Sequence, residues 1–219
     1  MKTPFSKMSK DKKGNLMIAG VVALGLLVLI LSFTGGKIPT SSHREDAVTS
    51  STAIKGESFS TTVELHEAEL IRVVDGDTLL VNFNNMEMYL RLLGVDTPES
   101  VNPDETKNNE YGEIASRYTK DLLKDTEYVY LEFGTTTSDK YGRILAYVWL
   151  DDEIVTADIN VMKEYMLNYI LVDQGYAYDK PVAPNLKYCD SFKDACENAK
   201  LTNTGLWCYK GFNQLYEAR

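Results

Sequence analysis

Five short segments between residues 63 and 150 have the residue pattern of β-strands. They span residues 63–74, 78–83, 86–95, 127–134 and 144–150, and a DGDT turn signal and an Asn-Asn pair separate the first three. Five strands of this length in one small domain favour a closed or nearly closed barrel. Within residues 86–95, alternation places Leu90 and Leu92 on one face and Arg91 on the other.

Apolar side chains recur at helical spacing in three further segments. The first contains Ile114, Tyr118 and Leu122, the second runs from about residue 157 to 173, and the third from about 186 to 201. The expected order is three strands, a helix, two strands and two helices, with the helices outside the barrel. The predicted fold class is therefore α+β, mainly a β-barrel.

The N-terminal region divides into three parts before the predicted barrel domain at residues 63–219. Residues 16–33 are apolar and carry no charge, which is near the minimum length that crosses a bilayer, and five lysines precede them. We expect a cytoplasmic segment (1–15), a single transmembrane anchor (16–33), a flexible tether (34–62) and an exported domain. A cleaved signal peptide and a secreted domain are the alternative.

The predicted domain is strongly acidic and contains all three cysteines of the chain. Residues 63–219 carry 28 acidic and 15 basic side chains, a net charge of −13. This charge disfavours non-specific binding to nucleic-acid backbones, but it is compatible with a local site made of a metal ion and arginines. Cys189, Cys196 and Cys208 favour one disulfide and one free thiol in an exported chain, with three reduced thiols as the alternative.

Acidic residues and arginines gather at the ends of the predicted strands. Asp77 and Asp96 could supply carboxylates, and Thr97 a backbone carbonyl, to a hard cation such as calcium. Arg91 and Arg143 could bind a phosphate through paired hydrogen bonds. Glu99 could then hold or deprotonate an attacking water. Taken singly, each of these motifs is also typical of an ordinary turn or a helix cap.

The motifs DGDT, RLLGVDTPE, EYGEIAS and DKYGRILAYVW, in this order between residues 69 and 207, closely resemble the staphylococcal nuclease (thermonuclease) family. The resemblance implies a five-stranded OB-fold barrel with three helices and a calcium-dependent phosphodiesterase that acts on DNA and RNA. It implies calcium ligation by Asp77, Asp96 and the carbonyl of Thr97, phosphate contacts from Arg91 and Arg143, and a general-base role for Glu99.

Tyrosines supply the remaining substrate-binding candidates. Tyr176 and Tyr178, in GYAYDKP, are similar to a tyrosine pair that seats the nucleotide in that family, with core packing as the alternative. Tyr141, in DKYGR, is a third candidate. The acidic domain and a long second helical region depart from the well-studied basic members of the family.

The leading hypothesis is therefore an exported, membrane-tethered, calcium-dependent endonuclease whose partners are DNA or RNA and, through residues 16–33, the cell membrane. A catalytically silent OB-fold module that binds nucleic acid or protein is the main alternative, and a calcium-binding structural domain is a third. The sequence makes no prediction of oligomeric state.

Overall fold

The structure, a computed structural model, describes residues 61–218. The predicted cytoplasmic segment, the predicted anchor at 16–33 and nearly all of the predicted tether lie outside the described residues. Within residues 61–218, no helix is long and apolar enough to cross a membrane.

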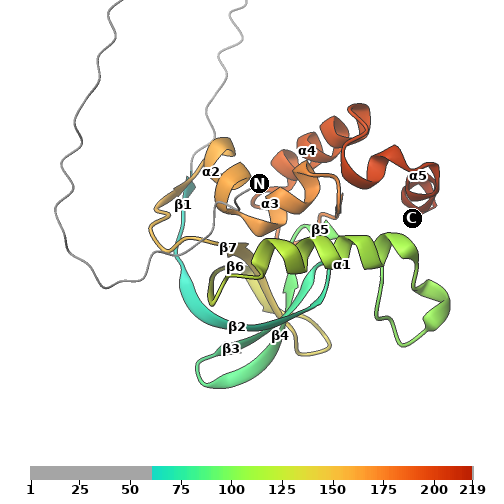
Figure 1. The fold of residues 1–219 in the computed structure, drawn as a ribbon. Coiled ribbons are helices and arrows are strands. Elements are labelled where there is room, and N and C mark those ends of the chain that lie inside the picture. Colours follow the sequence, from blue (N-terminus) through green and yellow to red (C-terminus); the bar gives the residue numbers. More distant parts are fainter. Residues whose placement is uncertain (1–60, 219) are drawn as a thin grey trace, which may run out of the picture. The chain divides into compact units, whose positions relative to one another are not determined.

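A closed five-stranded barrel forms the centre of the fold, as predicted (Figure 1). Its strands close in the order β2-β3-β4-β7-β6, and β4 and β7 pair in parallel whereas the other pairs are antiparallel. Asn84 and Asn85 connect β3 to β4 with φ values of 53° and 62°, the left-handed conformation that Asn tolerates in tight hairpins. The barrel strands are β2 (His66–Asp75), β3 (Thr78–Phe83), β4 (Met86–Leu92), β6 (Tyr128–Ser138) and β7 (Ile144–Trp149).

Two pairs of very short strands lie outside the barrel. The strand predicted at 86–95 ends at Leu92, because Gly94 adopts a φ of +74° and turns the chain. The next two residues, β5 (Val95–Asp96), pair with β9 (Tyr178–Asp179). In the other pair, β1 (Thr61–Thr62) lies beside β8 (Thr156–Ala157).

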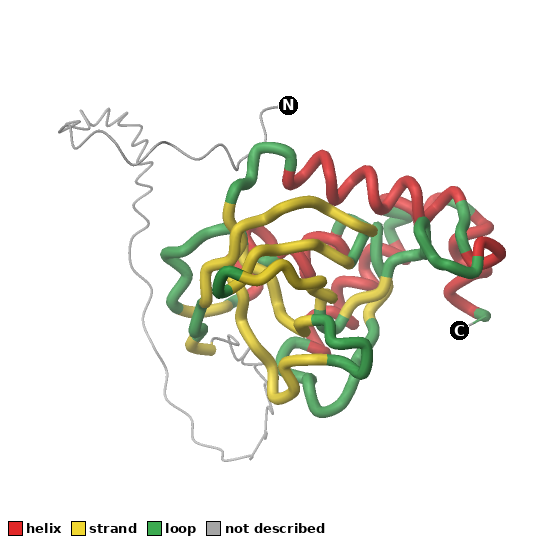
Figure 2. Tube along the Cα trace, turned by 90° about the horizontal axis from the view of Figure 1, so that it is seen from below, coloured by secondary structure: helices red, strands yellow, loops and turns green. Residues whose placement is uncertain are grey.

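The helices gather on one side of the barrel strands in both ribbon and tube views (Figures 1 and 2). The segment predicted as one helix at 157–173 is two helices, because Met166 is extended (φ −95°, ψ 109°) and bridges to Trp149. A C-terminal helix that the sequence pattern did not predict follows the third predicted one. The helices are α1 (Glu110–Leu123), α2 (Ile159–Tyr165), α3 (Leu167–Asp173), α4 (Cys189–Leu201) and α5 (Lys210–Glu217), with 3-10 turns η1 (Glu105–Lys107) and η2 (Gly205–Cys208).

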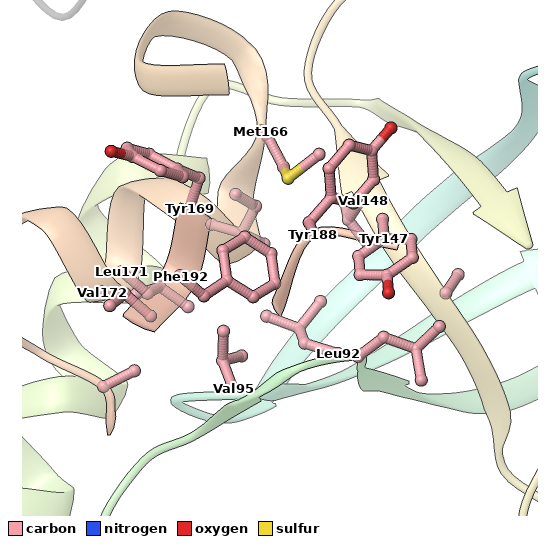
Figure 3. Packing of buried hydrophobic residues seen from close by; sticks show 14 of the residues in the cluster. Leu92, Val95, Tyr147, Val148, Met166, Tyr169, Leu171, Val172, Tyr188 and Phe192 are labelled. Carbon is pink, nitrogen blue, oxygen red and sulfur yellow. The ribbon is translucent and has the colours of Figure 1, made fainter. Parts of the chain in front are cut away.

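The core between the barrel and the helices fixes the turn that follows β4. Leu92 and Val95 pack beside Tyr147 and Phe192 in the buried cluster shown in Figure 3. The side chain of Asn168 is fully buried: its Oδ1 accepts a hydrogen bond from the Val148 amide at 2.8 Å, and its Nδ2 donates to the Leu93 carbonyl at 2.8 Å. Buried polar groups that are fully paired in this way hold one geometry. The turn at residues 93–96 is thus attached to both α3 and β7.

Cys189, Cys196 and Cys208 are free thiols in this structure. This agrees with the fully reduced alternative rather than with one disulfide.

Candidate active site

Arg91 is the centre of a polar cluster at the end of β4. Its Nη1 donates to the carbonyl oxygens of Leu92 and Val95, each at 2.9 Å. Its Nη2 lies 2.6 Å from Asp96 Oδ1 and 3.0 Å from Asp77 Oδ2. The planar guanidinium therefore holds the turn and two carboxylates together, which a single ammonium group could not do.

Asp77, in the turn between β2 and β3, is buried at 6% exposure. Its Oδ2 accepts the backbone amide of Thr97 at 2.7 Å, and its Oδ1 accepts the Thr78 hydroxyl at 3.2 Å. Burial raises the pKa of Asp77; the guanidinium of Arg91 opposes this shift, whereas the charge of Asp96 adds to it. The carboxylate is thus desolvated, and its contacts with Arg91 and the Thr97 amide offset only part of the free-energy cost of burying its charge.

Asp75 is a site residue that the sequence analysis treated only as part of a turn. It lines the same cleft as Asp77 and accepts the Ser100 hydroxyl at 2.6 Å and the Ser100 amide at 3.2 Å. These bonds connect the end of β2 to the segment that carries Glu99. The sequence signal that could have identified Asp75 is its place as the first acidic residue of DGDT, directly after a predicted strand.

Glu99 has an exposed side chain at the cleft, and the start of α1 fixes its backbone. Its carbonyl oxygen accepts the amide of Asn109 at 3.1 Å. A Cβ added to Gly112 would lie 2.1 Å from the same oxygen, so only glycine allows this close approach. Partial desolvation raises the pKa of Glu99; a hydrogen bond with Asn102 opposes the shift, and the nearby acidic charges, Asp77 foremost, reinforce it.

Arg143 and Tyr141 lie on the hairpin tip before β7. Arg143 Nε donates to Asp139 Oδ2 at 2.7 Å, and the Arg143 guanidinium carbon is 5.7 Å from the centre of the Tyr141 ring. Tyr141 is 73% exposed. Asp139 also accepts the amides of Tyr141 and Arg143, which orders the tip.

These side chains face one cleft with a volume of about 760 Å³. Thr97 is buried, at 2% exposure, and is not among the residues that line the cleft. Tyr176 and Tyr178 are not among its lining residues: Tyr176 stacks on Tyr118 at 3.8 Å, and Tyr178 stacks on Phe212 at 4.5 Å within the aromatic core. Of the predicted residues, the cleft brings together Asp77, Arg91, Asp96, Glu99, Tyr141 and Arg143, and it adds Asp75, Tyr89, Lys107 and Lys180.

The candidate metal ligands at the cleft are carboxylate oxygen atoms, which suit a hard cation. Residues 61–218 contain no group of three or more His, Cys, Asp and Glu side chains placed to hold a metal. The carboxylates of Asp77 and Asp96 are nevertheless linked through one guanidinium, and the first of them is desolvated. A calcium-sized ion takes carboxylate, carbonyl and water oxygens and would offset this desolvation. The chemistry of the Asp77 and Asp96 carboxylates, which both line the cleft, therefore suits such an ion.

Comparisons with known proteins give a consistent result. Residues 89–209 match the family model described as staphylococcal nuclease homologue. The thermonuclease of Staphylococcus intermedius is 35% identical over 187 residues, which cover 85% of this chain and 94% of that protein. The thermonuclease of Staphylococcus hyicus is 38% identical over 139 residues (64% and 74%). Endonuclease YncB of Bacillus subtilis strain 168 is 35% identical over 150 residues (68% and 65%).

Proposed function

The chain belongs to the staphylococcal nuclease homologue family, and on this basis we propose that its cleft hydrolyses phosphodiester bonds of DNA and RNA with calcium as the metal. The observation that carries the proposal is the grouping of Arg91, Arg143 and Glu99 with the carboxylates of Asp77 and Asp96 around one cleft. A site that transfers a phosphoryl group from a diester needs positive charge for the phosphate oxygens and a group that receives a proton from water.

The chain's own residues divide these tasks. Arg91 and Arg143 approach the cleft from β4 and from the hairpin before β7, so they can contact a phosphate from two sides. Each guanidinium can offer two parallel N–H donors to the oxygens, on which negative charge increases as water attacks phosphorus. Glu99, on the side of the cleft next to α1, takes the proton from the attacking water as its oxygen bonds to phosphorus. The P–O5′ bond breaks, and the departing 5′ oxygen takes a proton from solvent, which leaves a 3′-phosphate.

Bound calcium would add a positive charge beside the reacting phosphate, which lowers the cost of that negative charge. Arg91 has a second task in this account. It orients Asp77 and Asp96 through Nη2, so a phosphate bound by the same nitrogen would share it with these carboxylates.

We also propose that the cleft lies outside the cytoplasm on a chain anchored by residues 16–33. The support is the uncharged apolar run preceded by lysines. Protease added to intact cells should digest the domain while the membrane fraction keeps the N-terminal segment. A domain protected until the cells are lysed would contradict this topology.

The test of the activity uses the full-length chain purified in detergent. A single-stranded oligonucleotide is incubated at low salt with calcium or with excess chelator. We expect strand cleavage in calcium, loss of cleavage in chelator, and products that carry a 3′-phosphate. Calcium-dependent binding of the oligonucleotide without cleavage would instead establish a silent binding module.

A further inference from the structure

Tyr89 is a large aromatic residue for which the proposed reaction has no use. It lies on β4 two positions before Arg91, on the same outward face, and it is 48% exposed. Its side chain makes no hydrogen bond or ring contact in the part of the chain that the structure describes. About half of this residue's surface is therefore open to solvent at the wall of the cleft.

The strand register places Tyr89 next to the phosphate-binding candidates. In the parallel β4–β7 pair, Leu90 lies opposite Ile144. Leu90 and Ile144 are both buried in the barrel, so Tyr89 on β4 and Arg143, directly before β7, lie at the same level and outside the barrel core. Both line the cleft, as do Arg91 and Tyr141. A phosphate between the two arginines would hold an adjoining nucleobase within reach of the Tyr89 ring.

The charges of the cleft give a physical reason for such a contact. Its lining contains four basic residues, Arg91, Lys107, Arg143 and Lys180, and four acidic ones, Asp75, Asp77, Asp96 and Glu99. Each basic residue has a carboxylate partner within 4.0 Å. Bound calcium would add positive charge at the reacting phosphate only, so these balanced side chains, in a domain that is acidic as a whole, attract the rest of a phosphate chain weakly. Contacts with the bases would supply affinity that these side-chain charges do not.

We propose that Tyr89 is a base-stacking residue that binds an unpaired nucleobase next to the scissile phosphate of single-stranded DNA or RNA. The inference rests on the proposed nuclease function and adds a subsite to it. Stacking on an exposed aromatic side chain requires the face of the base to be free, so a base within a duplex cannot use this subsite. Affinity that comes from base stacking also predicts that substrate binding depends less steeply on salt than it would in a cleft with excess positive charge.

The test uses a tetrathymidylate in which only the central phosphodiester can be cleaved, because the other two linkages are methylphosphonates. The full-length chain in calcium is compared with Tyr89→Ala, Tyr89→Phe and Tyr209→Ala. Tyr209 is the matched control, since it is also 48% exposed but is not among the residues lining the cleft. We expect Tyr89→Ala to raise KM about 5- to 10-fold with little change in kcat, and Tyr89→Phe to stay within about 2-fold.

A second set of substrates identifies the base. Each thymine is removed in turn to leave an abasic position. One removal should raise KM for the unmodified protein by the same factor as Tyr89→Ala, and it should have no further effect in that variant. Equal KM for Tyr89→Ala and Tyr209→Ala, or full sensitivity to every abasic position in Tyr89→Ala, would overturn the inference and leave the nuclease function standing. If the unmodified protein does not cleave the tetranucleotide, the proposed function fails, and the subsite fails with it.

Discussion

Arg91 and Asp96 are in direct contact, with Arg91 Nη2 2.6 Å from Asp96 Oδ1, although they lie on either side of the turn that ends β4. The positive φ of Gly94 reverses the chain between them, and the Arg91 guanidinium also binds the Leu92 and Val95 carbonyls inside this turn. One side chain thus sets the positions of both carboxylates proposed as metal ligands, since it also contacts Asp77.

Arg91→Lys should therefore be severely impaired although it keeps the charge. An ammonium group cannot hold two carbonyls and two carboxylates in the plane of a guanidinium. We expect kcat to fall about 10²- to 10³-fold, as when one donor to a transition state is lost, and the melting temperature to fall as well. Arg72→Lys, at an exposed position on β2, is the control and should change neither quantity measurably. Nearly unchanged kcat in Arg91→Lys would show that the fork geometry is unimportant.

Lys180→Met should strengthen calcium binding. Lys180 Nζ lies 3.1 Å from Asp96 Oδ2, where it competes with a cation for the same carboxylate. Because the lysine is half exposed, the effect is screened, and we expect the calcium Kd to tighten roughly 3- to 10-fold by calorimetry. Lys163→Met removes a lysine that lies 3.9 Å from Asp173 and does not line the cleft, so it is the charge-matched control. Weaker calcium binding in Lys180→Met, but not in the control, would contradict competition at Asp96.

Gly112→Ala should lower activity by displacing Glu99. The new methyl group would lie 2.1 Å from the Glu99 carbonyl oxygen, so either α1 or the segment carrying Glu99 has to move. We expect overpacking to lower the free energy of unfolding by about 1–3 kcal/mol. At a temperature where the variant is fully folded, we also expect a lower kcat, which destabilisation alone would not cause. Glu113→Ala, the exposed neighbour on α1, should keep both. A fully active Gly112→Ala would show that the position of Glu99 tolerates the shift.

Alkaline pH should destabilise the fold through its buried tyrosines. Burial, reinforced by Asp173 and Asp194, raises the pKa of Tyr169 to about 12 from the usual 10. The unfolded chain then loses this proton at lower pH than the folded chain. The contribution of Tyr169 to stability is therefore constant below pH 10 and decreases as pH rises from 10 to 12.

Tyr169→Phe removes this contribution. The difference in unfolding free energy between the variant and the unmodified protein should shift by about 1 kcal/mol per pH unit in favour of the variant above pH 10, measured by urea unfolding. Tyr147→Phe should shift in the same direction, since burial also raises the pKa of Tyr147 to about 12. A difference that does not depend on pH between 9 and 12 would contradict the account.

The alternating pattern and the Asn-Asn hairpin were sufficient to predict the five barrel strands, because both report local backbone preferences. The break at Met166 could not be predicted in the same way. It depends on a bridge to Trp149, a contact between distant parts of the chain, while the helical spacing of apolar residues continues across it. Helix α5 was missed because the aromatic residues that bury it, Phe212 among them, pack on Tyr178 and Trp207 rather than forming a long periodic stretch.

The residues of the cleft likewise divide into those that local sequence motifs revealed and those whose role depends on distant neighbours. Asp77, Arg91, Asp96 and Glu99 were found because they lie within two short motifs, and Arg143 because it closes a third. Asp75, Tyr89 and Lys180 were missed because their importance depends on what faces them: Ser100, the outward side of β4 and Asp96. Tyr178 looks like a binding residue in the sequence, yet its ring is buried against Phe212.

The central claim is that this cleft cleaves phosphodiester bonds and that Glu99 receives the proton of the attacking water. It is tested most directly by the cleavage rate of Glu99→Ala at saturating calcium and substrate. Glu105→Ala, on the exposed turn η1, is the control for the loss of one acidic side chain. We predict that Glu99→Ala cleaves about 10²- to 10⁴-fold more slowly with calcium binding retained, while Glu105→Ala is unaffected. Equal rates in the two variants would contradict the assignment of this cleft as the active site.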